Sequence, residues 1–261
     1  MTEKDLAIAE KLNVRWIGID RPGIGFSTPK TGRKIIDWAD DLRQLVEQLN
    51  LKSYYILSVS GGTGYALAAA KCLPREQVKG VGIAIGVAPV QAGMKGMSLI
   101  NKWGYLTYRV FPGFFRFIIG RYMVPAMQKE DSTEAKAIVR KQLDFFKGED
   151  REEMTQPGME EGIIRLWQEV YRQGVDGHIE DSSVQLDDWG FRLEDVGYPG
   201  IKLWYGEKDV NTPPNMGKYL AARLEASVYK EYPGKSHFTM WQHIEEILSD
   251  LLSTPRQPWN P

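Results

Sequence analysis

The chain has 261 residues, 43% of them hydrophobic and 26% charged, which is the composition of an ordinary globular protein. Its 33 Lys and Arg balance 34 Asp and Glu, and a net charge of −1 gives no reason to expect a nucleic-acid partner. One cysteine excludes a disulfide framework or cysteine-based zinc cluster, and three histidines argue against a histidine-rich metal site. No run reaches the roughly 18–20 apolar residues of a membrane span, and no secretory signal is present, so we expect a cytoplasmic protein.

Short apolar segments alternate with segments of helical periodicity along the chain. The predicted strands are residues 14–19, 54–59, 78–88, 201–205 and 228–232. The predicted helices are residues 38–49, with Asp37 as N-cap, and residues 65–73, 216–224 and 241–252. Because these strands are almost continuously apolar and are separated by helices, the fold class predicted is α/β, with a mostly parallel sheet and helices on both faces.

Residues 91–193 differ from the rest, because they have helical patterns, many aromatic residues and no clear strand. We predict that they form a helical cap inserted between two strands of a core made of residues 1–90 and 194–253. The proline-rich residues 254–261 are predicted to form an irregular tail. Two interpretations of the cap aromatics remain open. They can form a helical core, or they can line an apolar substrate pocket, for which the candidates are Trp103, Tyr105 and Phe111.

The sharpest motif is Ser58-Val-Ser60-Gly61-Gly62, between a predicted strand and a predicted helix. A serine in such a tight turn projects its hydroxyl above the sheet, and the N–H of Gly61 can then point at a developing oxyanion. The usual pattern is Gly-x-Ser-x-Gly, and here Ser58 replaces the first glycine. Two alternatives are a glycine-rich turn without chemistry and a dinucleotide-binding turn, although Leu67 is bulky where the latter needs a small residue.

A serine nucleophile needs a base, and the base needs an orienting carboxylate. Asp209 follows the strand at 201–205, and His237 follows the strand at 228–232. The order Ser60, Asp209, His237, each beyond the carboxyl end of a strand, is the order expected for a catalytic triad on an open α/β sheet. Glu207 and Asp195 are the alternative acids.

Together these segments resemble the α/β-hydrolase family, in its capped, esterase- and peptidase-like form (the AB hydrolase-1 type), from about Val14 to Leu252. The resemblance is carried by Asp20-Arg-Pro-Gly-Ile-Gly-Phe-Ser27, by the serine turn, and by the turns that hold Asp209 and His237. It implies a serine hydrolase that acts through an acyl-enzyme on a small molecule, an ester or small amide with an apolar acyl group. It implies no metal and no organic cofactor.

The family takes a second oxyanion donor from a His-Gly loop after its third strand. In this sequence the resemblance begins at what looks like the helix after that loop, residues 3–12. We therefore expect the chain to lack the opening strands and the His-Gly loop. A truncated or non-catalytic relative, acting as a binding module, is the alternative to a hydrolase. The oligomeric state is not predicted.

Overall fold

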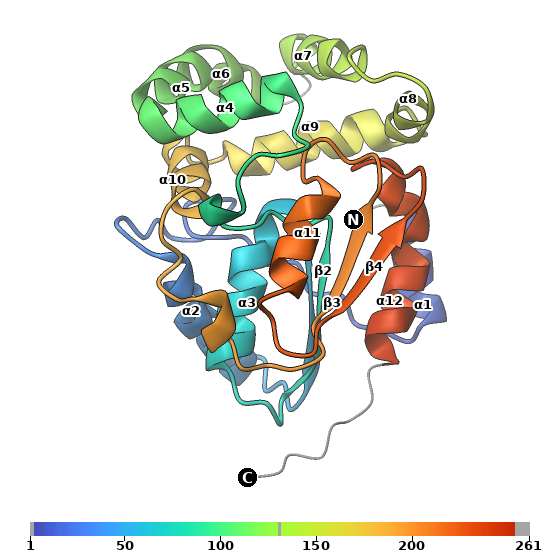
Figure 1. Ribbon diagram of the computed structural model, residues 1–261. Helices are drawn as coiled ribbons and strands as arrows, with labels where there is room; N and C mark the ends of the chain where they lie inside the picture. Colours follow the sequence, from blue (N-terminus) through green and yellow to red (C-terminus); the bar gives the residue numbers. More distant parts are fainter. Residues whose placement is uncertain (1–2, 130–131, 254–261) are drawn as a thin grey trace. The chain divides into compact units, whose positions relative to one another are not determined.

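The structure is a computed structural model that describes residues 3–129 and 132–253. Contacts between residues divide the chain into two compact units. The helical unit comprises the described residues of Met1–Gly32 and Tyr105–Ser183, and the sheet unit those of Arg33–Gly104 and Val184–Pro261. Figure 1 shows the elements of both. The assignment of residues 1–90 and 194–253 to a core and of 91–193 to a cap stays a prediction, and the tail at 254–261 lies outside the described residues.

The sheet unit contains one sheet among its described residues. Its strands are β1 (Tyr54–Val59), β2 (Val78–Ala84), β3 (Lys202–Gly206) and β4 (Val228–Tyr232), in the order β1-β2-β3-β4. Every neighbouring pair is parallel, with Leu57 opposite Gly82, Gly82 opposite Lys202, and Lys202 opposite Val228. The predicted parallel sheet is confirmed, and its carboxyl ends all face one edge.

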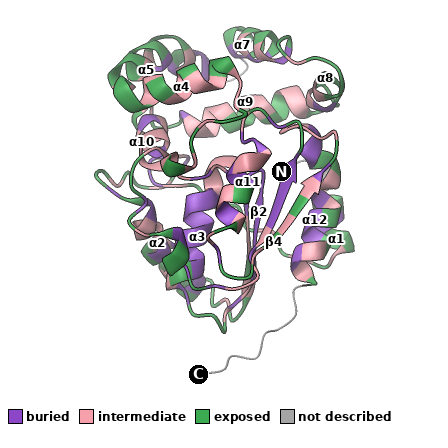
Figure 2. Cartoon of the chain, in the orientation of Figure 1, coloured by how far each residue is buried: buried purple, intermediate pink, exposed green. Residues whose placement is uncertain are grey.

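Helices cover both faces of this sheet. The side chains of the strands alternate between two core clusters, one on each face. Leu203 and Tyr205 belong to the larger cluster and Trp204 to the smaller one. Successive side chains on a strand point to opposite faces, so the two clusters lie on opposite sides of the sheet. The larger cluster includes residues of α2 (Trp38–Gln48), α3 (Thr63–Cys72) and α11 (Pro214–Ala221), and the smaller includes residues of α12 (Ile244–Leu252). Figure 2 shows β2 and most of α3 as buried.

The local sequence explains the end of α3 but not the start of α2. Asp37 occupies the predicted N-cap position of α2, but its carboxylate accepts a hydrogen bond from the N–H of Lys34 rather than capping the helix. Helix α3 ends at Cys72, because Leu73 adopts an extended conformation and Pro74 follows it.

The strand predicted at residues 14–19 is wrong, since the structure assigns no strand there. A strand forms only where a neighbour pairs with its N–H and C=O groups, and among the described residues β1 lies at an edge of the sheet and pairs with β2 alone. The turn that follows these residues is held within the helical unit instead. The N–H of Gly25 donates to the carbonyl of Glu169, and Nε2 of Gln173 donates to the carbonyl of Gly25.

The strand predicted at residues 78–88 is too long. β2 ends at Ala84 because Ile85 has φ of 46°, a left-handed value that turns the chain away from the strand direction. The Ile85 N–H still donates to the carbonyl of Trp204, so the turn stays attached to β3.

The helical unit is built from helices around an apolar core that includes Met127, Val139 and Tyr171. Its helices are α1 (Glu3–Lys11), the second part of α4 (Leu99–Val110), α5 (Pro112–Ile118), α6 (Val124–Met127), α7 (Thr133–Leu143), α8 (Glu149–Met154), α9 (Met159–Val170) and most of α10 (Asp176–Gln185). A π-helical turn, Ile119–Met123, joins α5 to α6. In the described part of the chain, no helix combines the length and apolar character needed to cross a bilayer.

Candidate active site

Ser60 occupies a strained backbone position directly after β1. Its φ is 52°, a value that few residues other than glycine adopt, whereas Val59 before it is extended. The Ser60 carbonyl accepts hydrogen bonds from the N–H of Val87 and from Oγ1 of Thr63, at 3.0 Å each. The chain thus passes from strand to helix within three residues, and the contacts of Ser60 hold the strained turn. Such strain is found preferentially at functional sites.

The residues around Ser60 leave little free space. An ideal Cβ placed on Gly62 would lie 3.1 Å from Cβ of Ser58, so a side chain at position 62 would crowd Ser58. Ser58 is buried, and within the described residues its hydroxyl oxygen has no hydrogen-bond partner. A serine therefore fits where the usual pattern has glycine, at the cost of an unsatisfied hydroxyl.

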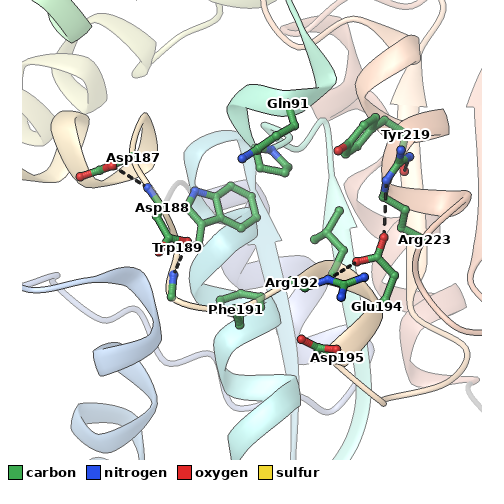
Figure 3. A pocket seen from close by; sticks show the side chains of 13 residues that line it. Gln91, Asp187, Asp188, Trp189, Phe191, Arg192, Glu194, Asp195, Tyr219 and Arg223 are labelled. Atoms are coloured by element: carbon green, nitrogen blue, oxygen red, sulfur yellow. Dashed lines mark hydrogen bonds and ion pairs between the residues drawn. The ribbon is translucent and has the colours of Figure 1, made fainter.

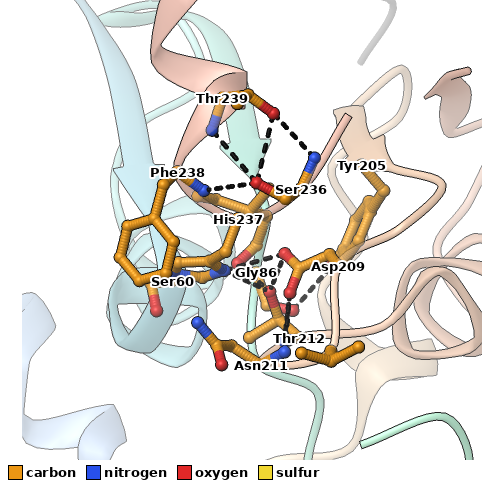
Figure 4. A network of polar contacts seen from close by, with 12 residues as sticks. Ser60, Gly86, Tyr205, Asp209, Asn211, Thr212, Ser236, His237, Phe238 and Thr239 are labelled. Carbon is orange, nitrogen blue, oxygen red and sulfur yellow. Dashed lines mark hydrogen bonds and ion pairs between the residues drawn. The ribbon is translucent and has the colours of Figure 1, made fainter. Parts of the chain in front are cut away.

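Asp209 and His237 form a close pair beyond β3 and β4. Oδ2 of Asp209 lies 2.7 Å from Nδ1 of His237, and the Asp209 side chain is fully buried (Figure 4). The other oxygen, Oδ1, accepts hydrogen bonds from the N–H groups of Asn211 at 2.7 Å and Thr212 at 2.8 Å. These donors hold the carboxylate in one orientation. When Nδ1–H of His237 donates to Asp209, Nε2 is left with a lone pair that can accept a proton.

Thr212 links this pair to the end of β2, a role that the sequence did not indicate. Its Oγ1 lies 2.8 Å from the carbonyl oxygen of Ile85, 2.9 Å from Oδ2 of Asp209 and 3.1 Å from Nδ1 of His237. Next to it, the hydroxyl of the fully buried Tyr205 donates to the carbonyl of Gly86. Burial raises the pKa of Tyr205 well above 10, so this hydroxyl remains a donor.

The loop after β2 connects Ser60 to the Asp209–His237 pair. Its Val87 N–H binds the carbonyl of Ser60, and its Ile85 carbonyl accepts from Thr212. Ser60, Asp209 and His237 therefore follow β1, β3 and β4 at the carboxyl edge of one sheet. Hydrogen bonds of the loop after β2 connect Ser60 to Thr212, which contacts the other two. Ligand and catalytic sites of open α/β sheets lie at this edge.

A second residue that the sequence did not indicate is Gln185, at the end of α10. Its carboxamide lies against Gly61, since an ideal Cβ on Gly61 would lie 2.3 Å from Oε1 and 3.3 Å from Nε2 of Gln185. Any side chain at position 61 would displace this group. The carboxamide thus sits beside the residue whose N–H is the candidate oxyanion donor.

The alternative acids have other surroundings. Oε2 of Glu207 accepts a hydrogen bond from the N–H of Gly234, which ties together the turns after β3 and β4. Asp195 is exposed, in a short 3-10 turn. The other two histidines lie elsewhere: Nδ1 of His243 contacts Glu246, and His178 belongs to the helical unit.

The candidate pocket residues have different exposures. Trp103 and Phe111 are 71% and 63% exposed, whereas Tyr105 is half-buried. One cavity of about 520 Å³ lies within the sheet unit, with Gln91, Trp189, Arg192 and Tyr219 among its lining residues (Figure 3). Neither the triad candidates nor these three aromatics line it, so it is not assigned to the substrate. In the described ranges, no group of three or more His, Cys, Asp or Glu is arranged to hold a metal ion.

Comparison with known proteins agrees with the fold. The model of the alpha/beta hydrolase family matches residues 4–250. No curated protein sequence matches the chain.

Several solved structures share the fold at low sequence identity. A bromoperoxidase from Bacillus anthracis has a TM-score of 0.65 and 18% identity, over 96% of this chain and 84% of that one. An esterase from Exiguobacterium antarcticum has a TM-score of 0.63 and 16% identity, over 94% and 84%. An enol-lactonase from Burkholderia xenovorans has a TM-score of 0.58 and 16% identity, over 90% and 79%.

Proposed function

We propose a serine hydrolase activity for this chain, which belongs to the alpha/beta hydrolase family. Ser60 is the nucleophile, His237 the general base and Asp209 the residue that orients His237. The observation that carries the proposal is the 2.7 Å contact between the buried Asp209 carboxylate and His237, at the same sheet edge as the strained Ser60.

In the proposed reaction, Nε2 of His237 takes the proton of the Ser60 hydroxyl while Oγ attacks the acyl carbon. The carbonyl electron pair moves to oxygen, and the Gly61 N–H stabilises the oxyanion. Collapse of this intermediate expels the alcohol or amine, which takes the proton from His237, and leaves an acyl-enzyme. Water then repeats the sequence and releases the acid and the free serine.

Gln185 is a candidate for a second oxyanion donor. A single backbone donor leaves the oxyanion incompletely stabilised, and losing one donor typically costs roughly 10²–10³ in rate. The Gln185 carboxamide carries two N–H groups and lies beside Gly61. Oε1 is the atom nearest to Gly61, so in this proposal the carboxamide rotates to present its N–H groups to the oxyanion, in the role of the His-Gly loop.

The proposed substrate is a small ester, or a small amide, with an apolar acyl group. The similar structures named as an esterase and an enol-lactonase support this class of substrate. Residues 91–193 are proposed to act as a helical cap, with Trp103, Tyr105 and Phe111 as candidates for contact with the acyl group. We propose a cytoplasmic location.

Hydrolysis of p-nitrophenyl esters of increasing acyl length tests the proposal. We expect turnover by the unaltered protein, and a Ser60→Ala variant with at least a roughly 10³-fold lower rate. Ser53→Ala is the matched control, because Ser53 is exposed and lies just before β1. Full turnover by Ser60→Ala would overturn the mechanism. A folded protein with no turnover on any ester would instead favour a non-catalytic relative that serves as a binding module.

A further inference from the structure

The helical unit carries an exposed apolar face on the second part of α4, on α5 and on the turn after it. We call this the α4–α5 face. Its members are between 37% and 66% exposed, and they are Leu106, Val110, Phe114, Phe117, Ile118 and Tyr122. Large apolar side chains rarely gather on a surface in this way unless they bind something. Figure 2 shows α5 as largely exposed.

This face is distinct from the core of the unit. The opposite side of the same helices packs inward, where Tyr108 stacks on Phe115 with ring centroids 3.8 Å apart. Ile119 is buried in the same core cluster, against which Met123 packs. The helices therefore have apolar residues on two sides, and the inner side alone supplies the core. The α4–α5 face is apolar without being needed for packing within the unit.

The charged residues within the segment that carries this face all have one sign. Arg109, Arg116 and Arg121 are exposed and alternate with its apolar residues. No Asp or Glu occurs between residues 77 and 129, although the chain as a whole has a net charge of −1. Arg116 contacts Asp176, an exposed residue from α10, at 2.8 Å. The segment that carries the face is thus basic, and the acidic residues that balance its charge lie elsewhere in the sequence.

We propose that the α4–α5 face docks on the surface of an anionic lipid bilayer. Helices that lie in a membrane interface combine Phe, Leu and other large apolar side chains with Lys and Arg, as this segment does. Phenylalanine rings insert among the acyl chains, whereas the tyrosine ring of Tyr122 suits the headgroup level. Arginines beside the inserted rings bind the phosphate and carboxylate groups of the lipids.

A second copy of the chain fits this face less well. In a two-fold dimer the same patch faces itself, so the three arginines of each copy would lie close to those of the other. Like charges across an interface are unfavourable, and of the three arginines only Arg116 has an ion pair with an acid, Asp176, among the described residues. An anionic surface satisfies both the apolar and the cationic parts of the face.

Flotation of the full chain with phosphatidylcholine vesicles, with and without phosphatidylserine, tests the proposal. We expect binding to the vesicles that contain phosphatidylserine, weakened by salt. Phe114→Ser with Phe117→Ser should lower the partition coefficient by at least about tenfold. Arg109→Gln and Arg121→Gln should each lower it by about fivefold. The matched controls are Phe145→Ser and Arg165→Gln, which change exposed residues elsewhere in the helical unit and should bind as the unaltered protein does.

The possible results separate clearly, provided thermal melting confirms that the variants are folded. Loss of binding in the phenylalanine and arginine variants but not in the controls supports the proposal. Absence of binding to phosphatidylserine vesicles overturns it, and so does binding that the phenylalanine variants leave unchanged. A stable dimer in light scattering that the phenylalanine variants dissociate would assign the face to a second copy instead. None of these results depends on hydrolase activity.

Discussion

Oδ2 of Asp209 lies 2.7 Å from Nδ1 of His237, and four polar contacts reach the two oxygens of this buried carboxylate. Two of the four come from backbone N–H groups of the turn that begins at Asp209 itself. The turn therefore fixes the carboxylate, and the carboxylate fixes the ring of His237. A general base requires this kind of rigid support to be effective.

The first prediction concerns the identity of the acid. Asp209→Asn should lower kcat by roughly 10³–10⁴, because an amide favours the histidine tautomer with the proton on Nε2 and cannot stabilise the imidazolium. Initial rates on the best p-nitrophenyl ester measure the effect. Glu207→Gln and Asp195→Asn are the controls and should retain most of the activity. A loss confined to either control would move the role of the acid to that residue.

The second prediction concerns Thr212. Its hydroxyl contacts Ile85, Asp209 and His237, so Thr212→Val should leave buried acceptors without a partner and destabilise the protein by about 1–3 kcal/mol. Denaturant unfolding measures the stability, and ester turnover should fall with it. Thr212→Ser keeps the hydroxyl and should restore both. Equal behaviour of the valine and serine variants would show that the hydroxyl has no such role.

The third prediction concerns the unsatisfied hydroxyl of Ser58. Replacing it by alanine removes a buried polar group that makes no hydrogen bond, so Ser58→Ala should stabilise the sheet unit by about 1 kcal/mol. Urea unfolding of the two proteins checks this. The control is Ser183→Ala, because Oγ of Ser183 donates to the carbonyl of Ile179, and it should bring no gain. A loss of stability in Ser58→Ala would mean that this hydroxyl is satisfied.

The fourth prediction is a pH dependence that originates in the helical unit. Burial lowers the pKa of His178 below 6.5, an effect that Arg21 strengthens and Asp181 opposes. Burial also raises the pKa of Tyr108 to about 12, so its hydroxyl can donate to Nε2 of His178, 3.0 Å away. The folded state thus favours neutral His178, which is half-buried.

The sign of this dependence follows from proton binding. Between the lowered pKa and about 6.5, the unfolded chain binds more protons than the folded one, so stability rises with pH in that window and this contribution levels off above it. The free energy of unfolding, measured from about pH 5 to about pH 8, should show this rise in stability. His178→Gln should reduce its slope, and an unchanged slope in that variant would exclude His178 as its source.

The sequence predicted the parallel sheet because β1 and β3 are short, largely apolar segments whose residues carry the signal locally. It failed at residues 14–19, where apolar residues are present but no strand within the described ranges pairs with them. It also placed the end of β2 too late, because an apolar run does not reveal that Ile85 adopts a positive φ.

The residues of the candidate site likewise divide into those that the sequence indicates and those that only the structure shows. Ser60 and His237 lie in short motifs with recognisable turn residues, so their sequence context was sufficient to select them. Gln185 approaches Gly61 from a helix far along the chain, and no local pattern records that contact. Thr212 is an ordinary polar residue after Asp209, and only the folded turn shows that its hydroxyl reaches both His237 and the end of β2.

Labelling of the purified protein with a fluorophosphonate, with the adduct mapped by mass spectrometry, tests the role of Ser60 as nucleophile most directly. Such a reagent modifies serines that a working base activates. We predict one adduct, on Ser60, which is lost in His237→Ala and retained in His243→Ala. A folded protein that forms no adduct on Ser60, or one whose labelling persists without His237, would contradict it.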